Sequence, residues 1–245
     1  MRRYLFLTFW FYALLGLISG NLPAQQNSAD SILLDNWALQ DPTGQTLRGS
    51  YREPFKDKPW FYYDSAEGSY IFAVPRTGYT TPHSQHVRCE LRQLSHGKPA
   101  AWNLTKDHEL SFSGMVTQLA GGSRGRTTLA QIFDASRGKP LTELEFGSGK
   151  LLLLVETTPK GGSSVLYPLA FVPLGQRYSL KLGLSRGKLW AQVSGQAPLE
   201  LSLASSFLQD KFYFKLGNYD QTSRAGPLGP PETVVKVFYS TLTIH

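Results

Sequence analysis

The sequence predicts an all-β protein built as a sandwich or jelly roll. From about Ile32 onward, short runs of aromatic and β-branched residues alternate with Gly, Pro, Asn and Ser, as in strands joined by tight turns. Helical periodicity is absent from this region, apart from one turn near 203–208. Because many short strands with regular turns close into packed sheets, one β domain is the simplest arrangement.

Twelve segments of this region are predicted as strands, and each is rich in β-branched or aromatic residues. Turn sequences such as Ser185-Arg186-Gly187-Lys188 separate neighbouring segments. The predicted strands are 61–63, 70–74, 87–94, 109–117, 127–133, 142–146, 151–157, 166–172, 178–185, 189–194, 212–219 and 234–244.

The N-terminal segment has the pattern of an export signal. Arg2 and Arg3 precede an apolar run that ends near Ile18, and a small, polar stretch offers a cleavage point after Ala24. The run is short for a bilayer-spanning helix, which needs roughly 20 residues, so a retained membrane anchor is the weaker alternative. We expect a signal peptide at 1–24, a flexible lead-in at 25–31, a β domain at 32–245, and a secreted or periplasmic protein without a membrane partner after cleavage.

Composition limits how the domain is stabilised and what it binds. Cys89 is the only cysteine, so an intramolecular disulfide is excluded and core packing must suffice. The formal net charge is +7, which favours an acidic partner through long-range attraction. Because an exported protein rarely meets nucleic acid, an anionic polysaccharide is the expected partner, and we expect a monomer.

The first segment with candidate chemistry is Arg88-Cys89-Glu90-Leu91-Arg92. Alternate side chains of a strand share a face, so the three charged residues point one way and Cys89 and Leu91 the other. Since guanidinium groups pair with carboxylates, we expect Glu90 to hold both arginines and leave donors free for a ligand carboxylate. An ordinary charge ladder on a solvated sheet face is the alternative.

The second segment runs from Tyr213 to Gln221 and reads Tyr-Phe-Lys-Leu-Gly-Asn-Tyr-Asp-Gln. Its odd positions place Tyr213, Lys215, Tyr219 and Gln221 on one face. We expect Gly217 to leave a gap in this face that admits a sugar ring. A solvated outer face with ordinary Tyr and Lys residues is again the alternative.

Together with Gln131-Ile132-Phe133, these segments resemble the alginate lyases of polysaccharide lyase family seven. That family has an Arg-x-Glu-Leu-Arg strand, a Gln-Ile-His or Gln-Val-His strand, and a Tyr-Phe-Lys-x-Gly-x-Tyr-x-Gln strand. The first and third are matched position for position by 88–92 and 213–221, and the resemblance spans about 33–245. It implies a β-jelly roll, a concanavalin-like sandwich, whose concave sheet forms an open substrate groove.

The resemblance also implies a lyase reaction, the β-elimination of a 4-linked uronate. Arg88 or Arg92 with Gln131 would bind the uronate carboxylate and stabilise the charge that develops on it. Tyr219 would protonate the leaving O4. A free Tyr has a pKa of about 10, but nearby cations favour the phenolate, so Tyr219 is expected to act as base as well as acid. Substrate contacts are expected from Glu90, Lys215, Tyr213, Gln221, Phe133 and His86.

The sequence departs from the family pattern at Phe133, where the family has His. In the family that His is given the base role for guluronate, whose proton and leaving oxygen lie on opposite faces of the ring. For mannuronate and glucuronate both lie on one face, and a single Tyr serves both ends. His83 stands where the family often has Asn, and we expect it to supply the carboxylate contact or part of the base function. Surface loop positions are the alternative for His83 and His86.

A non-catalytic protein that binds anionic glycans on the same fold is the competing interpretation, because Phe133 cannot transfer protons. Hydrolysis is disfavoured, since it needs two carboxyl groups flanking the bond and only Glu90 can be placed on the face. No spacing of His and carboxylate residues indicates a metal site, and no cofactor is expected.

Overall fold

The computed structural model describes residues 36–48, 57–82 and 84–244. The expected signal peptide and lead-in, and His83, lie outside the described residues. Within the described part, no helix is long and apolar enough to cross a bilayer.

The larger of two antiparallel sheets has nine strands. Its order is β12 (Ser164–Phe171), β11 (Lys150–Glu156), β10 (Lys139–Gly147), β9 (Arg126–Asp134), β16 (Phe212–Asp220), β6 (Arg88–Ser95), β1 (Trp37–Gln40) and β2 (Thr46–Arg48), with β7 (Lys98–Pro99) paired to β6.

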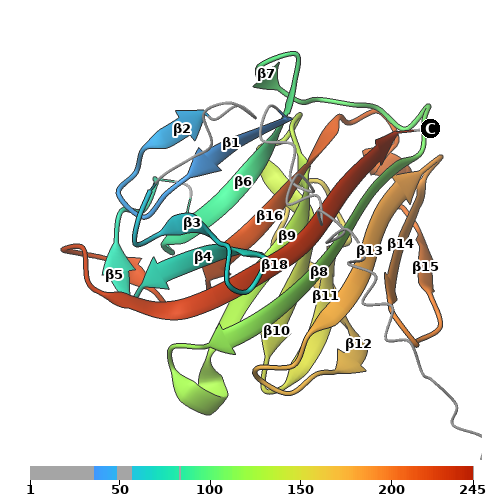
Figure 1. Cartoon of the computed structure of the whole chain (residues 1–245). Coiled ribbons are helices and arrows are strands. Elements are labelled where there is room, and N and C mark those ends of the chain that lie inside the picture. The colour runs from blue at the N-terminus through green and yellow to red at the C-terminus, as the bar shows by residue number, and fades with distance from the viewer. Residues whose placement is uncertain (1–35, 49–56, 83, 245) are drawn as a thin grey trace, which may run out of the picture.

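The smaller sheet has seven strands and lies in front of the larger one in Figure 1. Its order is β15 (Leu199–Ser202), β14 (Lys188–Val193), β13 (Tyr178–Ser185), β8 (His108–Gln118), β18 (Pro231–Ile244), β4 (Ser69–Pro75) and β3 (Phe61–Asp64). A parallel pair, β5 (Thr77–Gly78) and β17 (Arg224–Ala225), and two single-turn helices, Gly122–Arg124 and Ser205–Phe207, complete the described elements.

All twelve predicted strands are present, and the helical turn near 203–208 is the short helix Ser205–Phe207. The prediction missed β1, β2, β5, β7, β15 and β17. These strands have only two to four residues each, which is too short for an alternation of apolar and polar positions to be recognised. The predicted all-β class is confirmed.

The core lies between the two sheets and consists of apolar side chains from alternate strand positions. Leu91 and Phe214 from the larger sheet and Phe72 and Phe112 from the smaller sheet are almost fully buried there. Cys89 is fully buried beside them and its thiol donates to the carbonyl of Trp60, 3.4 Å away. The opposite face of these same strands of the larger sheet is therefore left for polar side chains.

Strand β16 is joined to the smaller sheet by a buried polar clasp, which we define as Asn218, Asp220 and their partners. The Asn218 amide donates to the carbonyls of Phe72 and Thr233 at 3.0 and 2.9 Å and accepts from the Thr127 hydroxyl at 2.7 Å. The Asp220 carboxylate accepts from the Thr233 hydroxyl at 2.6 Å. These bonds fix both residues that flank Tyr219.

Candidate active site

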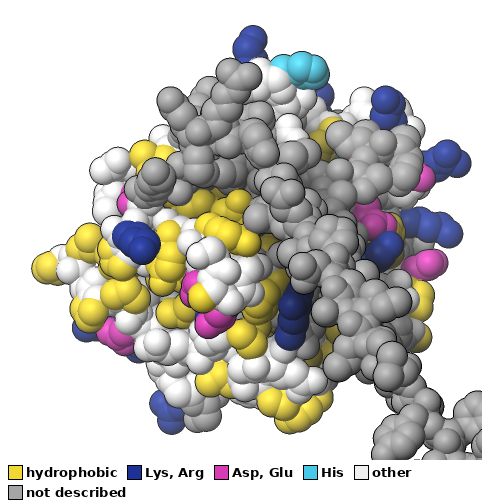
Figure 2. Space-filling model, in the orientation of Figure 1, with side chains coloured by type: hydrophobic (Ala, Val, Ile, Leu, Met, Phe, Trp, Pro, Cys, Tyr) yellow, Lys and Arg dark blue, Asp and Glu magenta, His cyan; other side chains and the backbone are white. Residues whose placement is uncertain are grey.

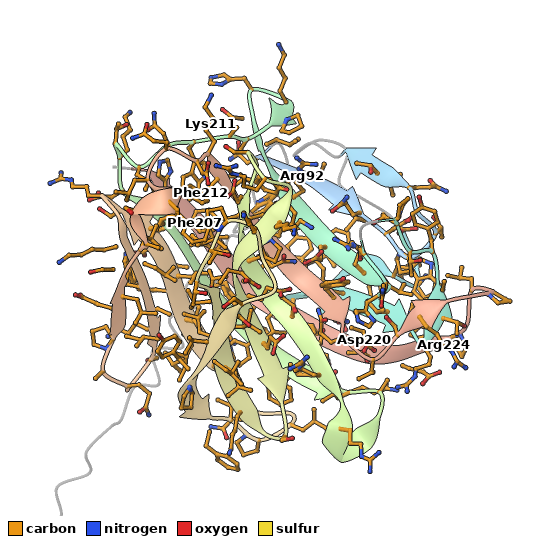
Figure 3. All side chains as sticks on the ribbon, turned by 180° about the vertical axis from the view of Figure 1, so that it is seen from behind. Arg92, Phe207, Lys211, Phe212, Asp220 and Arg224 are labelled. Atoms are coloured by element: carbon orange, nitrogen blue, oxygen red, sulfur yellow. The ribbon has the colours of Figure 1, made fainter. Side chains whose placement is uncertain are left out.

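A groove of about 440 Å³ lies on the outer face of the larger sheet. Figure 3 views the molecule from this side, with Arg92 toward one end of the sheet and Asp220 toward the other. Figure 2 shows the side of the smaller sheet, where Lys and Arg side chains are scattered rather than gathered. The groove is lined by Gln40, Thr81, Ser84, Arg88, Arg92, Gln131, Phe133, Ala135, Gly138, Lys139, Pro140, Glu143, Tyr213, Lys215, Tyr219 and Gln221.

The strand register brings distant parts of the sequence together in the groove. Lys215 of β16 lies opposite Arg92 of β6 on one side and Gln131 of β9 on the other. Tyr219 lies opposite Arg88 in the same way. The three motifs that the sequence analysis singled out therefore occupy three adjacent strands.

Glu90 lies beneath the groove and holds its polar groups in place. Its carboxylate, fully buried, forms ion pairs with Arg88 at 3.2 Å and with Lys215 at 3.3 Å, and accepts a short hydrogen bond from the Gln131 amide. A buried carboxylate with two cations and an amide donor is well compensated. Glu90 therefore positions these side chains rather than lining the groove.

The Tyr219 phenol is held by Ser84 and Arg88. Its hydroxyl forms a 2.8 Å hydrogen bond with the Ser84 hydroxyl, which also accepts from the Arg88 guanidinium. The same guanidinium lies 4.3 Å from the centre of the Tyr219 ring. Burial outweighs the Ser84 hydrogen bond and the Arg88 charge, so the pKa of Tyr219 is raised above its usual value, contrary to the expected shift toward the phenolate.

Aromatic and cationic groups stack at the other end of the groove. The Phe133 and Tyr213 rings lie 5.1 Å apart, with the Lys215 ammonium 4.9 Å from the Phe133 ring. The Arg92 guanidinium lies 4.5 Å from the Tyr213 ring. Burial lowers the pKa of Lys215 to about 8, although the Glu90 carboxylate opposes this shift.

Most of the predicted site residues meet in this groove. Lining it are Tyr219, Arg88, Arg92, Gln131, Lys215, Tyr213, Gln221 and Phe133. His83 lies outside the described residues. His86 is not a lining residue; its Nδ1 lies 2.7 Å from the Ser223 carbonyl, and its ring is edge-on to Tyr219 with centroids 6.0 Å apart.

Two expectations from the strand pattern are wrong. Within the described chain, Glu90 pairs with Arg88 and Lys215 and not with Arg92, because Lys215 on the neighbouring strand takes that place and Arg92 stacks on Tyr213. Gly217 is not there to admit a sugar ring. A Cβ on it would lie 2.4 Å from the Cys89 carbonyl oxygen, and its φ of 149° favours glycine, so β16 needs Gly217 to pack against β6.

Sequence reasoning missed the contributions of Ser84, Gln40 and Glu143 to the groove. Ser84 follows His83 in a loop and Gln40 ends a four-residue strand, so neither carries a periodic signal. Glu143, on β10, lies opposite Gln131 of β9. The alternation of 142–146 could have placed Glu143 on the groove face if the order of the strands had been known. Among the described side chains, no group of three His, Cys, Asp or Glu residues is placed to hold a metal.

Chemically, the groove offers cationic and amide donors for a carboxylate and a phenol held within hydrogen-bonding distance of a hydroxyl. Guanidinium, ammonium and amide groups stabilise negative charge that develops on a bound acid. A phenol whose pKa is influenced by a neighbouring cation can give and take a proton. The arrangement is suited to proton transfer on an anionic ligand.

Comparison with known proteins agrees with the family resemblance of the three motifs. The sequence model of a family described as alginate lyase matches residues 32–245. A comparison with curated proteins found no match.

Among solved structures, alginate lyase PA1167 from Pseudomonas aeruginosa is 26% identical with a TM-score of 0.77, over 86% of this chain and 99% of that one. Alginate lyase A1-II', described as a member of polysaccharide lyase family 7, is 22% identical with a TM-score of 0.75, over 88% and 97%. A variant of A1-II' in complex with its substrate (GGMG) is 23% identical with a TM-score of 0.76, over 88% and 95%. These matches confirm the predicted β-jelly roll.

Proposed function

This chain belongs to the alginate lyase family and is a polysaccharide lyase, and from this premise we propose that it cleaves a 4-linked uronic-acid polysaccharide by β-elimination with Tyr219 as the proton-transfer group. The observation that carries the proposal is the Tyr219 hydroxyl, held by Ser84 at the edge of a groove that also presents Arg88, Gln131 and Lys215. The similar protein A1-II' was solved with the oligouronate substrate GGMG, which supports an anionic polysaccharide as the substrate class.

The first step is neutralisation of the uronate carboxylate. Arg88 or Arg92, together with the Gln131 amide, binds the carboxylate and makes the C5 proton more acidic. These donors then stabilise the enolate-like charge that develops as the proton leaves. The Nε of Arg92 is buried and has no hydrogen-bond partner among the described residues.

The second step is proton transfer by Tyr219. As phenolate it removes the C5 proton, a double bond forms between C4 and C5, the C4–O4 bond breaks, and the proton passes from the phenol to the departing O4. Burial raises the pKa of Tyr219, and Ser84 and Arg88 oppose this shift, which makes the phenolate more accessible than burial alone would allow. One group can serve both ends only where the proton and the leaving oxygen lie on the same face of the ring.

Phe133 decides the preference among uronates. It lines the groove where the family motif has His, and its ring is covered by Tyr213 and Lys215. A phenyl ring cannot accept a proton from the opposite face of the sugar. We therefore place β-linked mannuronate or glucuronate, and not guluronate, as the substrate.

The test is incubation of the purified protein with mannuronan, guluronan and glucuronan, with unsaturated ends followed by near-ultraviolet absorbance. We expect product from mannuronan or glucuronan, and loss of at least about 100-fold in rate for Tyr219→Phe, within the range of general acid–base catalysis. Tyr62→Phe, on the smaller sheet, is the matched control and keeps its activity. Binding to a polyuronate without product would instead support a non-catalytic glycan-binding protein.

Restoring the family residue gives a second prediction. Phe133→His places a base in the groove on the far side of the sugar from Tyr219, so cleavage of guluronan should appear or rise at least about 10-fold. The ratio of initial rates on guluronan and mannuronan measures the change. An unchanged ratio in a correctly folded variant would show that position 133 does not set the preference.

A further inference from the structure

Three carboxyl groups lie at or beneath the groove, and they differ in their partners. Glu90 has Arg88 and Lys215, and Glu145 has Arg126 at 3.4 Å. Glu143 lines the groove itself, and among the residues described no cation pairs with it. The Thr128 hydroxyl, 3.3 Å from Oε1, donates a hydrogen bond to it. Glu143 is thus an uncompensated acid in a groove built for anions.

The neighbours of Glu143 on the two adjacent strands supply no positive charge. On β9 it lies opposite Gln131 and near Thr128, both neutral, and on β11 it lies opposite Leu154. Charged groups within electrostatic reach are Glu145 on its own strand, Glu90 on β6 and Lys215 on β16; the titratable Tyr219 of β16 is also within reach. Two groups favour the carboxylate: the Thr128 hydroxyl, which donates a hydrogen bond to it, and Lys215, which is already paired with Glu90.

The protonation state follows from this environment. Burial, followed by the charges of Glu145 and Glu90, raises the pKa of Glu143 to about 7. A uronate carboxylate in the groove adds a third negative charge and raises this pKa further. Glu143 therefore holds its proton near neutral pH when a polyuronate is bound.

We propose that Glu143 binds the polyuronate as a neutral carboxylic acid, donating a hydrogen bond to a sugar carboxylate or hydroxyl, so that the substrate binds best while this side chain holds its proton. The inference rests on the proposed function for its ligand but concerns affinity rather than cleavage. When Glu143 loses its proton, the donor becomes an acceptor and its charge repels the anionic chain.

The competing assignment is that Glu143 acts as the catalytic base. The charges in the groove instead favour its protonated form. A base must be ionised while the substrate is bound. The bound carboxylate, together with Glu90 and Glu145, opposes that state. The missing histidine at position 133 is thus not replaced by Glu143.

The test is proton linkage measured on the full-length protein, in a Tyr219→Phe background that prevents turnover. A mannuronate tetrasaccharide is titrated calorimetrically at pH 7.5 in buffers of different ionisation enthalpy, which gives the number of protons taken up on binding. Glu143→Gln, which mimics the neutral acid, should lower this uptake by about half to one proton. Any remaining uptake belongs to Lys215, whose lowered pKa an anion also raises.

Affinity across pH gives the second measurement. From pH 7 to 8.5 the affinity of the background protein should fall by up to about tenfold per pH unit, and Glu143→Gln should flatten this fall. Glu156→Gln, on β11 and outside the groove lining, is the matched control and should behave like the background. Near-ultraviolet circular dichroism and the thermal midpoint show that both variants are folded.

Each remaining outcome counts against the inference. Equal proton uptake with and without Glu143→Gln overturns it. Unchanged affinity and uptake, but loss of turnover when Glu143→Gln is made with Tyr219 intact, would make Glu143 the base. No binding of any uronate tetrasaccharide would overturn the proposed substrate class itself, a result separate from the other two.

Discussion

At the scale of single residues, the reactivity of Tyr219 is set by two opposing influences. Burial disfavours the phenolate, whereas the Ser84 hydrogen bond and the Arg88 guanidinium favour it. Ser84 is hydrogen-bonded to both Tyr219 and Arg88, so it also fixes the geometry of the phenol relative to the guanidinium. Ser84 is a positioning residue, since its effect on the reaction passes through Tyr219.

The pH profile tests this assignment. Ser84→Ala removes one of the two influences that lower the pKa of Tyr219, so that pKa rises. Activity that depends on the phenolate then requires a higher pH, and the ascending limb of the kcat profile should move to the alkaline side, with kcat at neutral pH reduced about 10-fold. Ser185→Ala, whose hydroxyl donates to Asp107 away from the groove, should leave the profile in place. A drop in kcat with an unmoved profile would contradict the role.

The ion pair between Glu90 and Lys215 is a contact that the sequence alone could not predict. The alternation of 88–92 predicted correctly that Arg88, Glu90 and Arg92 share a face. It could not predict that Lys215, 125 positions away in sequence, would take the place expected for Arg92. Spacing within one strand fixes side-chain direction, but the ion pair depends on which strand lies next to it.

At the scale of elements, both faces of β16 are occupied, one by the core and the polar clasp and the other by the groove. Its even positions enter the core and the polar clasp, and Tyr213, Lys215 and Tyr219 face the groove. The register with β9 shifts between Leu216 and Tyr219. The close approach of Gly217 to the backbone of β6 accompanies this irregularity.

Gly217→Ala should therefore cost stability. The added methyl group would meet the Cys89 carbonyl oxygen and Glu90 Cα at 2.4 and 2.9 Å, and the φ of 149° is unfavourable for alanine. Strain and overpacking together should lower the free energy of unfolding by about 2 kcal/mol or more, measured by urea denaturation. Gly162→Ala, with a φ of 78° and no atom within 4 Å of the new methyl, isolates the backbone cost and should lose only about 1 kcal/mol. Equal losses would contradict a steric role for Gly217.

At the scale of the whole molecule, the sequence predicted the class and twelve strands: the eleven strands of six or more residues, whose patterns have room to repeat, and the short aromatic strand β3. The order of strands within the sheets was not predictable, and β9, β16 and β6 come together from three distant segments. The family motifs, and not periodicity, indicated that these segments meet. Glu143 belonged to no motif, so its place in the groove emerged only from the fold.

The polar clasp is the feature that joins the two sheets beneath the site. Asn218→Leu keeps the size of the side chain but leaves two carbonyls and the Thr127 hydroxyl without their partner. We expect a loss of about 3 kcal/mol in the free energy of unfolding, measured by urea denaturation. Gln192→Leu, at a partly exposed position of β14, should change it by no more than about 0.5 kcal/mol. A loss as small as that control would show that the clasp does not hold the sheets together.

The buried thiol of Cys89 can report when the two sheets separate. Cys89 lies on β6 between Arg88 and Glu90, is fully buried, and has a pKa raised by that burial. A thiol reagent can reach it only when β6 separates from the opposing sheet, because the reactive thiolate neither forms nor meets solvent in the closed molecule. The labelling rate of unmodified protein, with and without an oligouronate, thus measures how far ligand binding suppresses opening of the strand that carries the arginines.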